Sequence, residues 1–249
     1  MLSHLESGKG VPVVLVHGNF ACKEWWWEVL QNPPEGTWLL APDLPGFGES
    51  QAPRDFTPSI PAYAQALRAF LQEKDAEEAI LVGHSLGGAV VMEAAGEKTR
   101  GLVLINPAPP SGLQTPEAYY PILEGYRYNR EALAQALAAM APTHRPPWFP
   151  ELVEKAQGMH PAHFQGNARA LAAWRLERIY PGPVLVVYGT LDPLITRVMA
   201  AETAAFFPRG RLLALEGVGH SVNLESPALL KDILKDFVKE VYGEVQGRG

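Results

Sequence analysis

The sequence has few of the features that mark secreted, membrane-bound or metal-binding proteins. Cys22 is the single cysteine among 249 residues, so the chain can form neither an internal disulfide nor a cysteine-based zinc site. No apolar run reaches the about 18 residues of a transmembrane helix, and the first residues lack the basic start and apolar stretch of a secretory signal. We therefore expect a cytoplasmic protein that does not bind a membrane.

Basic residues are neither numerous nor clustered. The chain has 21 Lys and Arg against 27 Asp and Glu, a formal charge of −6, and no basic run. Nucleic acids and anionic membrane surfaces are bound by dense basic faces, so neither is expected as a partner. The seven histidines are scattered, and we expect no metal and no other cofactor. A small-molecule substrate is the expected partner, and the sequence leaves the oligomeric state open.

Short apolar runs rich in Val, Ile and Leu alternate with segments of helical periodicity. The predicted strands are 11–16, 37–41, 79–83, 101–105, 184–188 and 211–215, with a possible edge strand at 2–6. The predicted helices between them are 25–30, 60–74, 87–97, 195–206 and 227–241. This alternation predicts an α/β fold with a mostly parallel sheet of about seven strands and helices on both faces. Reactive groups are then expected on loops beyond the carboxyl ends of the strands.

Residues 106–183 interrupt this alternation, because they contain no convincing strand pattern and are too many for a structureless loop. Helical patterns occur there at 116–126, 130–140, 150–159 and 162–172. We predict a core formed by 1–106 and 184–249 and a helical cap formed by 107–183. Residues 243–249 are expected to form a frayed tail.

The strongest motif is Gly83-His84-Ser85-Leu86-Gly87, which follows an apolar run and precedes a helical one. This is G-x-S-x-G in a strand–turn–helix context, the nucleophile elbow. Glycines are needed because a serine at the tip of so sharp a turn is strained, and Cβ atoms two residues to either side would clash. Ser85 is therefore the predicted nucleophile.

A serine hydroxyl needs a histidine to take its proton and an acid to orient that histidine. In this fold the acid and then the histidine follow the serine, each after a strand. Asp192 and His220 meet that requirement, because each closely follows a predicted strand. Glu216 is a conceivable substitute acid, but it is so close to His220 in the sequence that it would hardly span the required geometry.

The oxyanion of the tetrahedral intermediate needs two backbone N–H donors. Leu86, directly after the nucleophile, is expected to supply one. The loop after His17-Gly18 is expected to supply the other, from Asn19 or else from Phe20. His17 itself fits a structural hydrogen-bonding role better than acid–base catalysis.

Five segments together resemble the α/β-hydrolase superfamily: His17-Gly18, the stretch from Pro42 to Ser50, 83–88, 189–192 and Gly219-His220. The length and single helical cap are similar to those of small carboxylesterases, including carrier-protein methyl esterases, and of their lyase relatives. The resemblance implies a Ser-His-Asp triad, no required cofactor and an eight-stranded type of sheet. Because the N-terminal segment looks too short for the family's first strand, we expect seven strands here.

These observations predict a serine hydrolase that cleaves a carboxylic ester through an acyl-enzyme. The same triad could instead serve carbon–carbon bond hydrolysis or an elimination reaction, and a non-catalytic ligand-binding protein of this fold is a more distant alternative. Phe20, Trp25, Trp148 and Trp174 are candidates to line the substrate pocket. For each aromatic residue the competing interpretation is packing within the core or cap.

Overall fold

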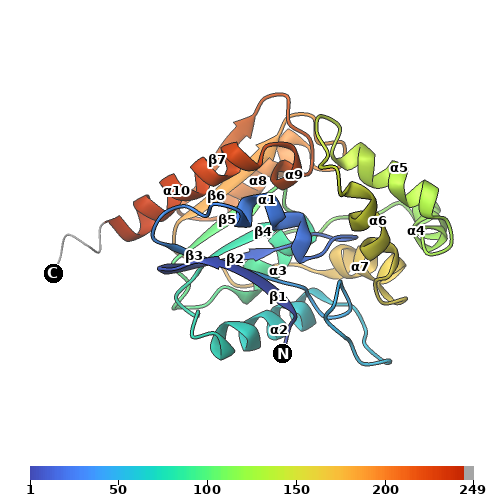
Figure 1. The fold of residues 1–249 in the computed structure, drawn as a ribbon, viewed down its shortest axis with the longest axis horizontal. Coiled ribbons are helices and arrows are strands. Elements are labelled where there is room, and N and C mark those ends of the chain that lie inside the picture. Colours follow the sequence, from blue (N-terminus) through green and yellow to red (C-terminus); the bar gives the residue numbers. More distant parts are fainter. Residues whose placement is uncertain (244–249) are drawn as a thin grey trace.

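The computed structural model describes residues 1–243, and its centre is a twisted sheet whose strands alternate along the chain with helices (Figure 1). The strands are β1 (His4–Gly8), β2 (Val11–Val16), β3 (Thr37–Pro42), β4 (Ile80–His84), β5 (Gly101–Ile105), β6 (Val184–Gly189) and β7 (Gly210–Leu215). Across the sheet their order is β1-β3-β2-β4-β5-β6-β7. β1 pairs antiparallel with β3, and the other neighbouring pairs are parallel. The predicted sheet, mostly parallel and with seven strands in the described part of the chain, is confirmed.

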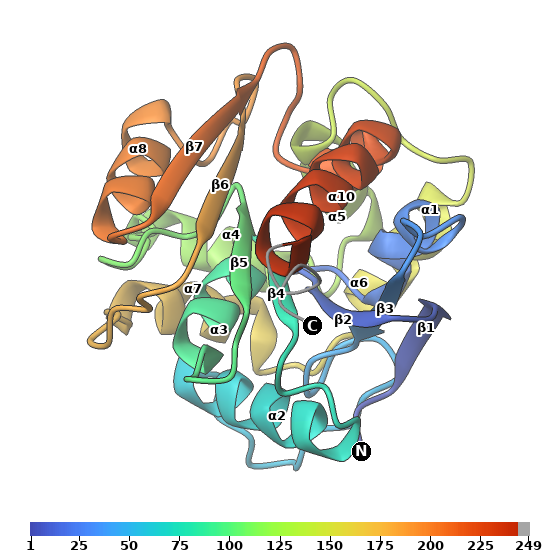
Figure 2. The ribbon, with the colours of Figure 1, turned by 90° about the vertical axis from the view of Figure 1, so that its left-hand side faces the viewer.

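Helices cover both faces of this sheet (Figure 2). They are α1 (Trp27–Leu30), α2 (Ile60–Glu73), α3 (Leu86–Ala94), α8 (Arg197–Phe206), α9 (Val222–Glu225) and α10 (Pro227–Gly243). The apolar side chains of α2, α3 and α8 join one hydrophobic cluster, and those of α1, α9 and α10 contribute to a second. All residues of β4, β5 and β6 are buried, which explains why these strands are continuous apolar runs rather than alternating ones.

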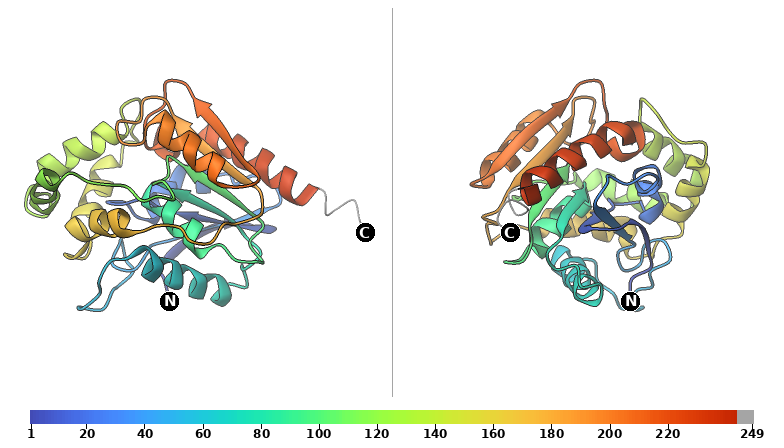
Figure 3. Two further views of the ribbon diagram at one scale, coloured as in Figure 1. Left: turned by 180° about the vertical axis from the view of Figure 1, so that it is seen from behind. Right: turned by 60° about the vertical axis from the view of Figure 1, so that its left-hand side comes forward.

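The chain between β5 and β6 forms a separate group of helices at one end of the sheet (Figures 1 and 3). This group contains the 3-10 turn η2 (Glu117–Tyr119) and the helices α4 (Tyr120–Gly125), α5 (Arg130–Met140), α6 (Phe149–Gln157) and α7 (His163–Ala173). We call residues 107–183 the cap. Leu133, Leu152 and Phe164 carry its apolar faces into the same hydrophobic cluster as α2 and α3.

The structure differs from the predicted elements mainly where helices are short. The predicted helix 25–30 is a 3-10 turn, η1 (Lys23–Trp26), followed by the single turn of α1. The predicted helix 116–126 is likewise divided between η2 and α4, because Pro121 has no N–H for an intrahelical bond and fits only the first turn. α9 was not predicted, since four residues are too few to show a periodicity. The predicted tail, apart from Gly243, lies outside the described residues.

Candidate active site

Ser85 stands at the turn between β4 and α3 with φ 54° and ψ −115°, a backbone conformation that is strained for a residue with a side chain. The turn is tight enough to exclude side chains nearby. A Cβ at Gly83 would overlap the carbonyl of Gly87, and a Cβ at Gly87 would overlap the carbonyl of His17. The two glycines of the motif are therefore required by the close approach of backbone segments around the serine.

Asp192 follows β6, His220 follows β7, and the structure brings their side chains into contact. The Asp192 Oδ2 atom lies 2.6 Å from His220 Nδ1. The other carboxylate oxygen, Oδ1, accepts hydrogen bonds from the backbone amides of Leu194 at 2.7 Å and Ile195 at 2.9 Å. One oxygen thus fixes the carboxylate to its own loop, while the second faces the imidazole. This is the arrangement that orients a histidine as a base.

His220 lies directly against His84, the residue that precedes Ser85. The ring centroids of the two histidines are 4.8 Å apart, and His84 Nε2 lies 2.9 Å from the carbonyl oxygen of His220. A carbonyl only accepts, so His84 must donate from a protonated Nε2. Burial, and then the neighbouring His220, lower the pKa of His84 well below its usual value, so the ring is neutral. His84 therefore anchors the backbone of the histidine loop beside the serine.

Asn106, which the sequence analysis did not single out, connects the two loops that carry Asp192 and His220. Its Nδ2 donates to the carbonyl oxygens of Gly219 at 3.1 Å and His220 at 2.8 Å, and its Oδ1 accepts from the amide of Gly189 at 2.9 Å. The side chain is fully buried and the backbone has φ 40°. A signal was present in the sequence, because Asn106 is a polar residue directly after a predicted strand.

Glu225 holds the same histidine loop from the other side. Its carboxylate accepts hydrogen bonds from the amides of Gly219 at 3.1 Å and Ser221 at 3.2 Å, and from the Thr143 hydroxyl at 2.7 Å. Thr143 belongs to the cap, so this carboxylate also joins the cap to the loop. No sequence pattern pointed to Glu225, because it lies in the single turn of α9.

The loop after β2 lies against Ser85 and presents a candidate oxyanion donor. A Cβ at Gly18 would lie 3.2 Å from the Ser85 Cβ atom. The amide of Phe20 donates to the Asn19 side chain, at 3.0 Å from Oδ1, whereas the amides of Asn19 and Leu86 donate to no protein acceptor within residues 1–243. Leu86 is the first residue of α3, where helical N–H groups are free. Of the two candidates in this loop, the hydrogen bonding favours Asn19 over Phe20.

His17 is fully buried and its two ring nitrogens are both used. The Leu44 amide donates to Nε2 at 3.0 Å, and Nδ1 lies 2.8 Å from the Gly18 carbonyl oxygen. The proton must therefore reside on Nδ1, and burial lowers the pKa of the ring. His17 joins the loop after β2 to the loop after β3, which is a structural role.

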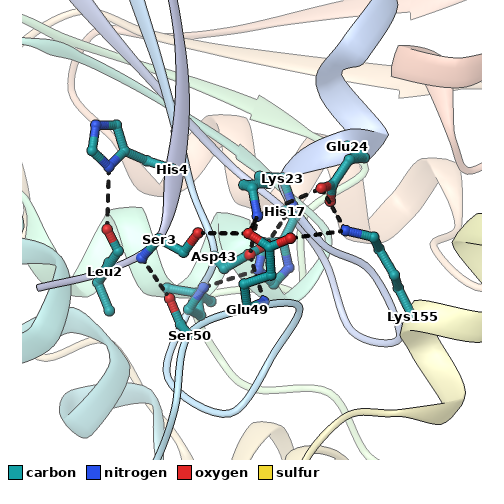
Figure 4. A network of polar contacts seen from close by, with 11 residues as sticks. Leu2, Ser3, His4, His17, Lys23, Glu24, Asp43, Glu49, Ser50 and Lys155 are labelled. Atoms are coloured by element: carbon teal, nitrogen blue, oxygen red, sulfur yellow. Dashed lines mark hydrogen bonds and ion pairs between the residues drawn. The ribbon is translucent and has the colours of Figure 1, made fainter.

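A network of charged groups fixes the start of the loop after β3 (Figure 4). The buried Lys23 ammonium lies 2.9 Å from Asp43 Oδ2 and 2.7 Å from Glu49 Oε2. Burial alone would lower the pKa of Lys23, but its hydrogen bonds to Glu49 and Asp43 outweigh burial and raise the pKa. Lys155 on the cap helix α6 joins the network 2.6 Å from Glu24 Oε1. The network therefore ties the cap to the core.

The side chains of the candidate site are almost inaccessible to solvent. Ser85 is 8% exposed and His220 is 4% exposed. Phe20, next to the candidate oxyanion donor, packs edge-on against the cap residues Tyr126 and Phe164, with centroid distances of 5.9 and 5.8 Å. The candidate site is thus enclosed between the core loops and the cap.

The tryptophan candidates occupy three different environments. Trp25 is buried in the same cluster as Phe20, and its Nε1 has no partner within the described chain. Trp148 is half-buried at the start of α6. Trp174 donates from Nε1 to Glu93 at 2.9 Å and lines an open groove of about 1000 Å³ between α2, α3 and α7. None of the residues that line this groove belongs to the elbow, and the role of Trp174 in substrate binding stays a prediction.

Residues 1–243 contain no group of three or more His, Cys, Asp or Glu side chains arranged to hold a metal ion. No helix in this part is long and apolar enough to cross a membrane.

Comparison with known proteins identifies the family of the chain. The chain is 27% identical over 254 residues to the 2-hydroxymuconate semialdehyde hydrolase of Pseudomonas sp. (strain CF600), covering 94% of this chain and 89% of that protein. A putative aryl esterase from Burkholderia cenocepacia superposes with a TM-score of 0.81 at 25% identity, covering 97% of this chain and 95% of that one. The Exiguobacterium antarcticum esterase EaEST has the same fold, with a TM-score of 0.82 at 20% identity over 96% of this chain and 95% of its own. The sequence profile of the alpha/beta hydrolase family matches residues 13–233, and the chain belongs to that family.

Proposed function

We propose that this hydrolase cleaves a small carboxylic ester through an acyl-enzyme, with Ser85 as nucleophile, His220 as base and Asp192 as the acid that orients His220. The observation that carries the proposal is the contact of 2.6 Å between Asp192 Oδ2 and His220 Nδ1, in a loop that His84 anchors beside the strained Ser85. A buried carboxylate on Nδ1 leaves Nε2 as the nitrogen free to accept a proton.

The reaction divides into acylation and deacylation. Ser85 Oγ attacks the ester carbonyl carbon while His220 Nε2 takes the hydroxyl proton, and the amides of Asn19 and Leu86 stabilise the oxyanion. The intermediate expels the alcohol, which receives the proton from His220. A water molecule then gives its proton to His220 and attacks the acyl-enzyme, and release of the carboxylic acid returns the proton to Ser85. Asp192 stabilises the imidazolium in both halves.

The enclosure of the site supports a substrate of limited size. Ser85 and His220 are nearly buried, and Phe20 is packed between aromatic side chains of the cap. An ester with a short-to-medium acyl group or a small alcohol fits this setting. Exclusion of water by the cap also strengthens the electrostatic stabilisation of the oxyanion.

Carbon–carbon bond hydrolysis is a second candidate. The similarity to 2-hydroxymuconate semialdehyde hydrolase over 94% of this chain favours it. The same serine, histidine and oxyanion donors could act on a ketone carbonyl, with a carbanion rather than an alkoxide as the leaving group.

A panel of p-nitrophenyl esters of increasing acyl length, assayed with the wild type and Ser85→Ala, tests the proposal. We expect turnover of short and medium esters and a loss on the order of 10⁴–10⁶ in the variant. 2-Hydroxymuconate semialdehyde is assayed in parallel. Turnover of this compound with negligible ester hydrolysis would replace the ester proposal with the carbon–carbon one, and unchanged activity in Ser85→Ala would contradict both.

A further inference from the structure

The cap helix α7 reaches the candidate oxyanion loop through one buried side chain, Asn167. Its Nδ2 atom donates to Asn19 Oδ1 at 2.8 Å, although the two residues are 148 positions apart in the sequence. Asn167 is fully buried. A buried carboxamide needs hydrogen-bond partners, because burial of a polar group without them is costly. One of the partners of Asn167 is the side chain of the proposed oxyanion donor.

The Asn19 side chain in turn sets the conformation of its own loop. Its Oδ1 also accepts the backbone N–H of Phe20 at 3.0 Å, and Phe20 has φ 54°. One oxygen therefore receives two hydrogen bonds, one from the loop and one from the cap. This engages the Phe20 amide, whereas the Asn19 amide has no acceptor within the described residues.

Donor and acceptor roles determine which atom of the Asn19 and Asn167 carboxamides is oxygen and which is nitrogen. A backbone N–H can only donate, so the Asn19 atom that faces the Phe20 amide is oxygen. The Asn167 atom that faces this oxygen must then be the NH₂ group, which turns Asn167 Oδ1 toward Tyr63. The Tyr63 hydroxyl donates to that oxygen at 2.6 Å.

His163 lies beside this buried chain of polar groups. Its Nε2 atom lies 2.8 Å from the Pro45 carbonyl oxygen and 3.3 Å from the Tyr63 hydroxyl. Burial lowers the pKa of His163 to about 4, so at neutral pH the ring is uncharged and Nε2–H donates to Pro45. With the Nε2 proton given to Pro45 and the hydroxyl proton of Tyr63 given to Asn167, His163 lies against the Tyr63 oxygen but does not accept from it. The uncharged hydrogen-bonded chain is therefore Tyr63–Asn167–Asn19, which leads to the candidate oxyanion loop.

We propose that Asn167 is a positioning residue that sets the oxyanion donor of Asn19 when α7 is docked on the core. The inference rests on the proposed function, because it takes the Asn19 amide as an oxyanion donor. Phe164, one turn earlier on α7, packs against Phe20 at 5.8 Å and supports the same loop. The cap then does more than cover the substrate: the oxyanion site is complete only with the cap in place.

Asn167→Asp is the sharpest test, because it preserves side-chain size and the acceptor for Tyr63 but removes the donor to Asn19. The measured quantity is the rate constant with which an alkyl fluorophosphonate phosphonylates Ser85. In that reaction Ser85 Oγ bonds to phosphorus, fluoride leaves, the hydroxyl proton passes to His220, and the P=O oxygen occupies the oxyanion site. We expect a decrease of about tenfold, less than the 10²–10³ that follows complete loss of an oxyanion donor.

Asn129→Asp is the matched control. It makes the same chemical change in the same cap, at the exposed N-cap of α5, where Asn129 Oδ1 accepts from the Ala132 amide. Aspartate serves equally well at an N-cap, so the rate should equal that of the wild type. For ester hydrolysis by Asn167→Asp we expect kcat to fall with KM nearly unchanged, and the acid limb of the pH profile to stay in place because the base is untouched.

Tyr63→Phe is the second variant, with an expected decrease of about two- to threefold, since Asn167 loses its fixed partner but keeps its donor to Asn19. A folded Asn167→Asp protein that is phosphonylated at the wild-type rate overturns the inference. If that variant fails to fold, a wild-type rate for Tyr63→Phe overturns it. A wild type that does not react with the reagent at all contradicts the proposed function instead.

Discussion

The loops at the edge of the sheet and the helices of the cap meet around Ser85, but different kinds of contact hold them. Ser85, Asp192 and His220 each follow a strand of the sheet, and the Asn106 side chain fixes the loops of Asp192 and His220 through their backbone groups. In the cap, α4 buries only Tyr120 among its side chains, and α5 buries only two leucines. Polar contacts such as Asn167 to Asn19 and Lys155 to Glu24 join the cap to the core.

This difference predicts different effects for substitutions in the two regions. The proposed triad lies on loops that follow strands of the sheet, so we expect it to keep one geometry as long as the sheet is folded. The cap is held by side chains, with apolar residues in the same hydrophobic cluster as α2 and α3 and polar contacts such as Asn167 to Asn19, and a single polar contact can be altered without unfolding the core. Substitutions at the sheet edge should therefore abolish the reaction, whereas substitutions in the cap should change its rate or the stability of the closed form.

The largest effect is expected from the histidine and its acid. Asp192→Asn keeps the acceptor for the Leu194 and Ile195 amides but removes the anion from His220. Ester turnover should fall by about 10⁴-fold, and His220→Ala should lower it at least as much. Circular dichroism should show both variants folded. Retention of more than a tenth of the wild-type kcat by either variant would remove that residue from the triad.

Asn106→Leu should affect both activity and folding. It leaves the Gly219 carbonyl and the Gly189 amide without their buried partner, whereas the His220 carbonyl keeps its hydrogen bond from His84. Each unsatisfied group costs about 1–3 kcal/mol, so the free energy of unfolding should fall by about 2–6 kcal/mol in urea titrations, and turnover should fall with it. Thr203→Val removes a buried hydroxyl from α8, away from these loops, and should leave turnover unchanged. Equal loss of turnover in both variants would show that Asn106 has no specific effect on the triad.

His163 should make the contact between cap and core sensitive to acid. Its pKa is lowered to about 4 in the folded protein, against about 6.5 for an ordinary histidine, so the unfolded chain binds the proton first. Its contribution to stability is present above about pH 6.5 and is lost as the pH falls toward 4. Over that interval the wild type should lose about 3 kcal/mol more than His163→Gln in denaturant unfolding. Parallel pH curves for the two proteins would show that this ring does not titrate as inferred.

The smallest effect is expected at the exposed part of the charged network. Lys155 is 31% exposed and pairs with Glu24. Lys155→Met should lower the free energy of unfolding by less than about 1 kcal/mol, and high salt should reduce the difference, because solvent screens such pairs. A difference that is large, or that does not respond to salt, would mean that Lys155 holds the cap by more than this ion pair.

The sequence predicted the core well because its signals are local. Continuous apolar runs identify β4, β5 and β6, and the glycines around Ser85 are required by backbone overlap that any such turn produces. Asp192 and His220 could be chosen because each closely follows a strand. The side chains that hold these residues were harder to find. Glu225 and Asn167 act on atoms that only the folded chain brings near, and neither position carries a distinctive pattern. For Trp174 the sequence showed only a large aromatic residue in the cap, and the folded chain was needed to show that it bonds to Glu93 and lines the groove beside α3.

Detection of the acyl-enzyme is the most direct test of the proposed mechanism. A p-nitrophenyl ester of short acyl length is mixed with the protein, quenched in acid during the first turnovers, digested and mapped by mass spectrometry. We expect a mass increase of one acyl group on the peptide that contains Ser85, and fragment ions that assign it to that serine. Ester hydrolysis without an adduct, or an adduct on Ser221, would contradict it.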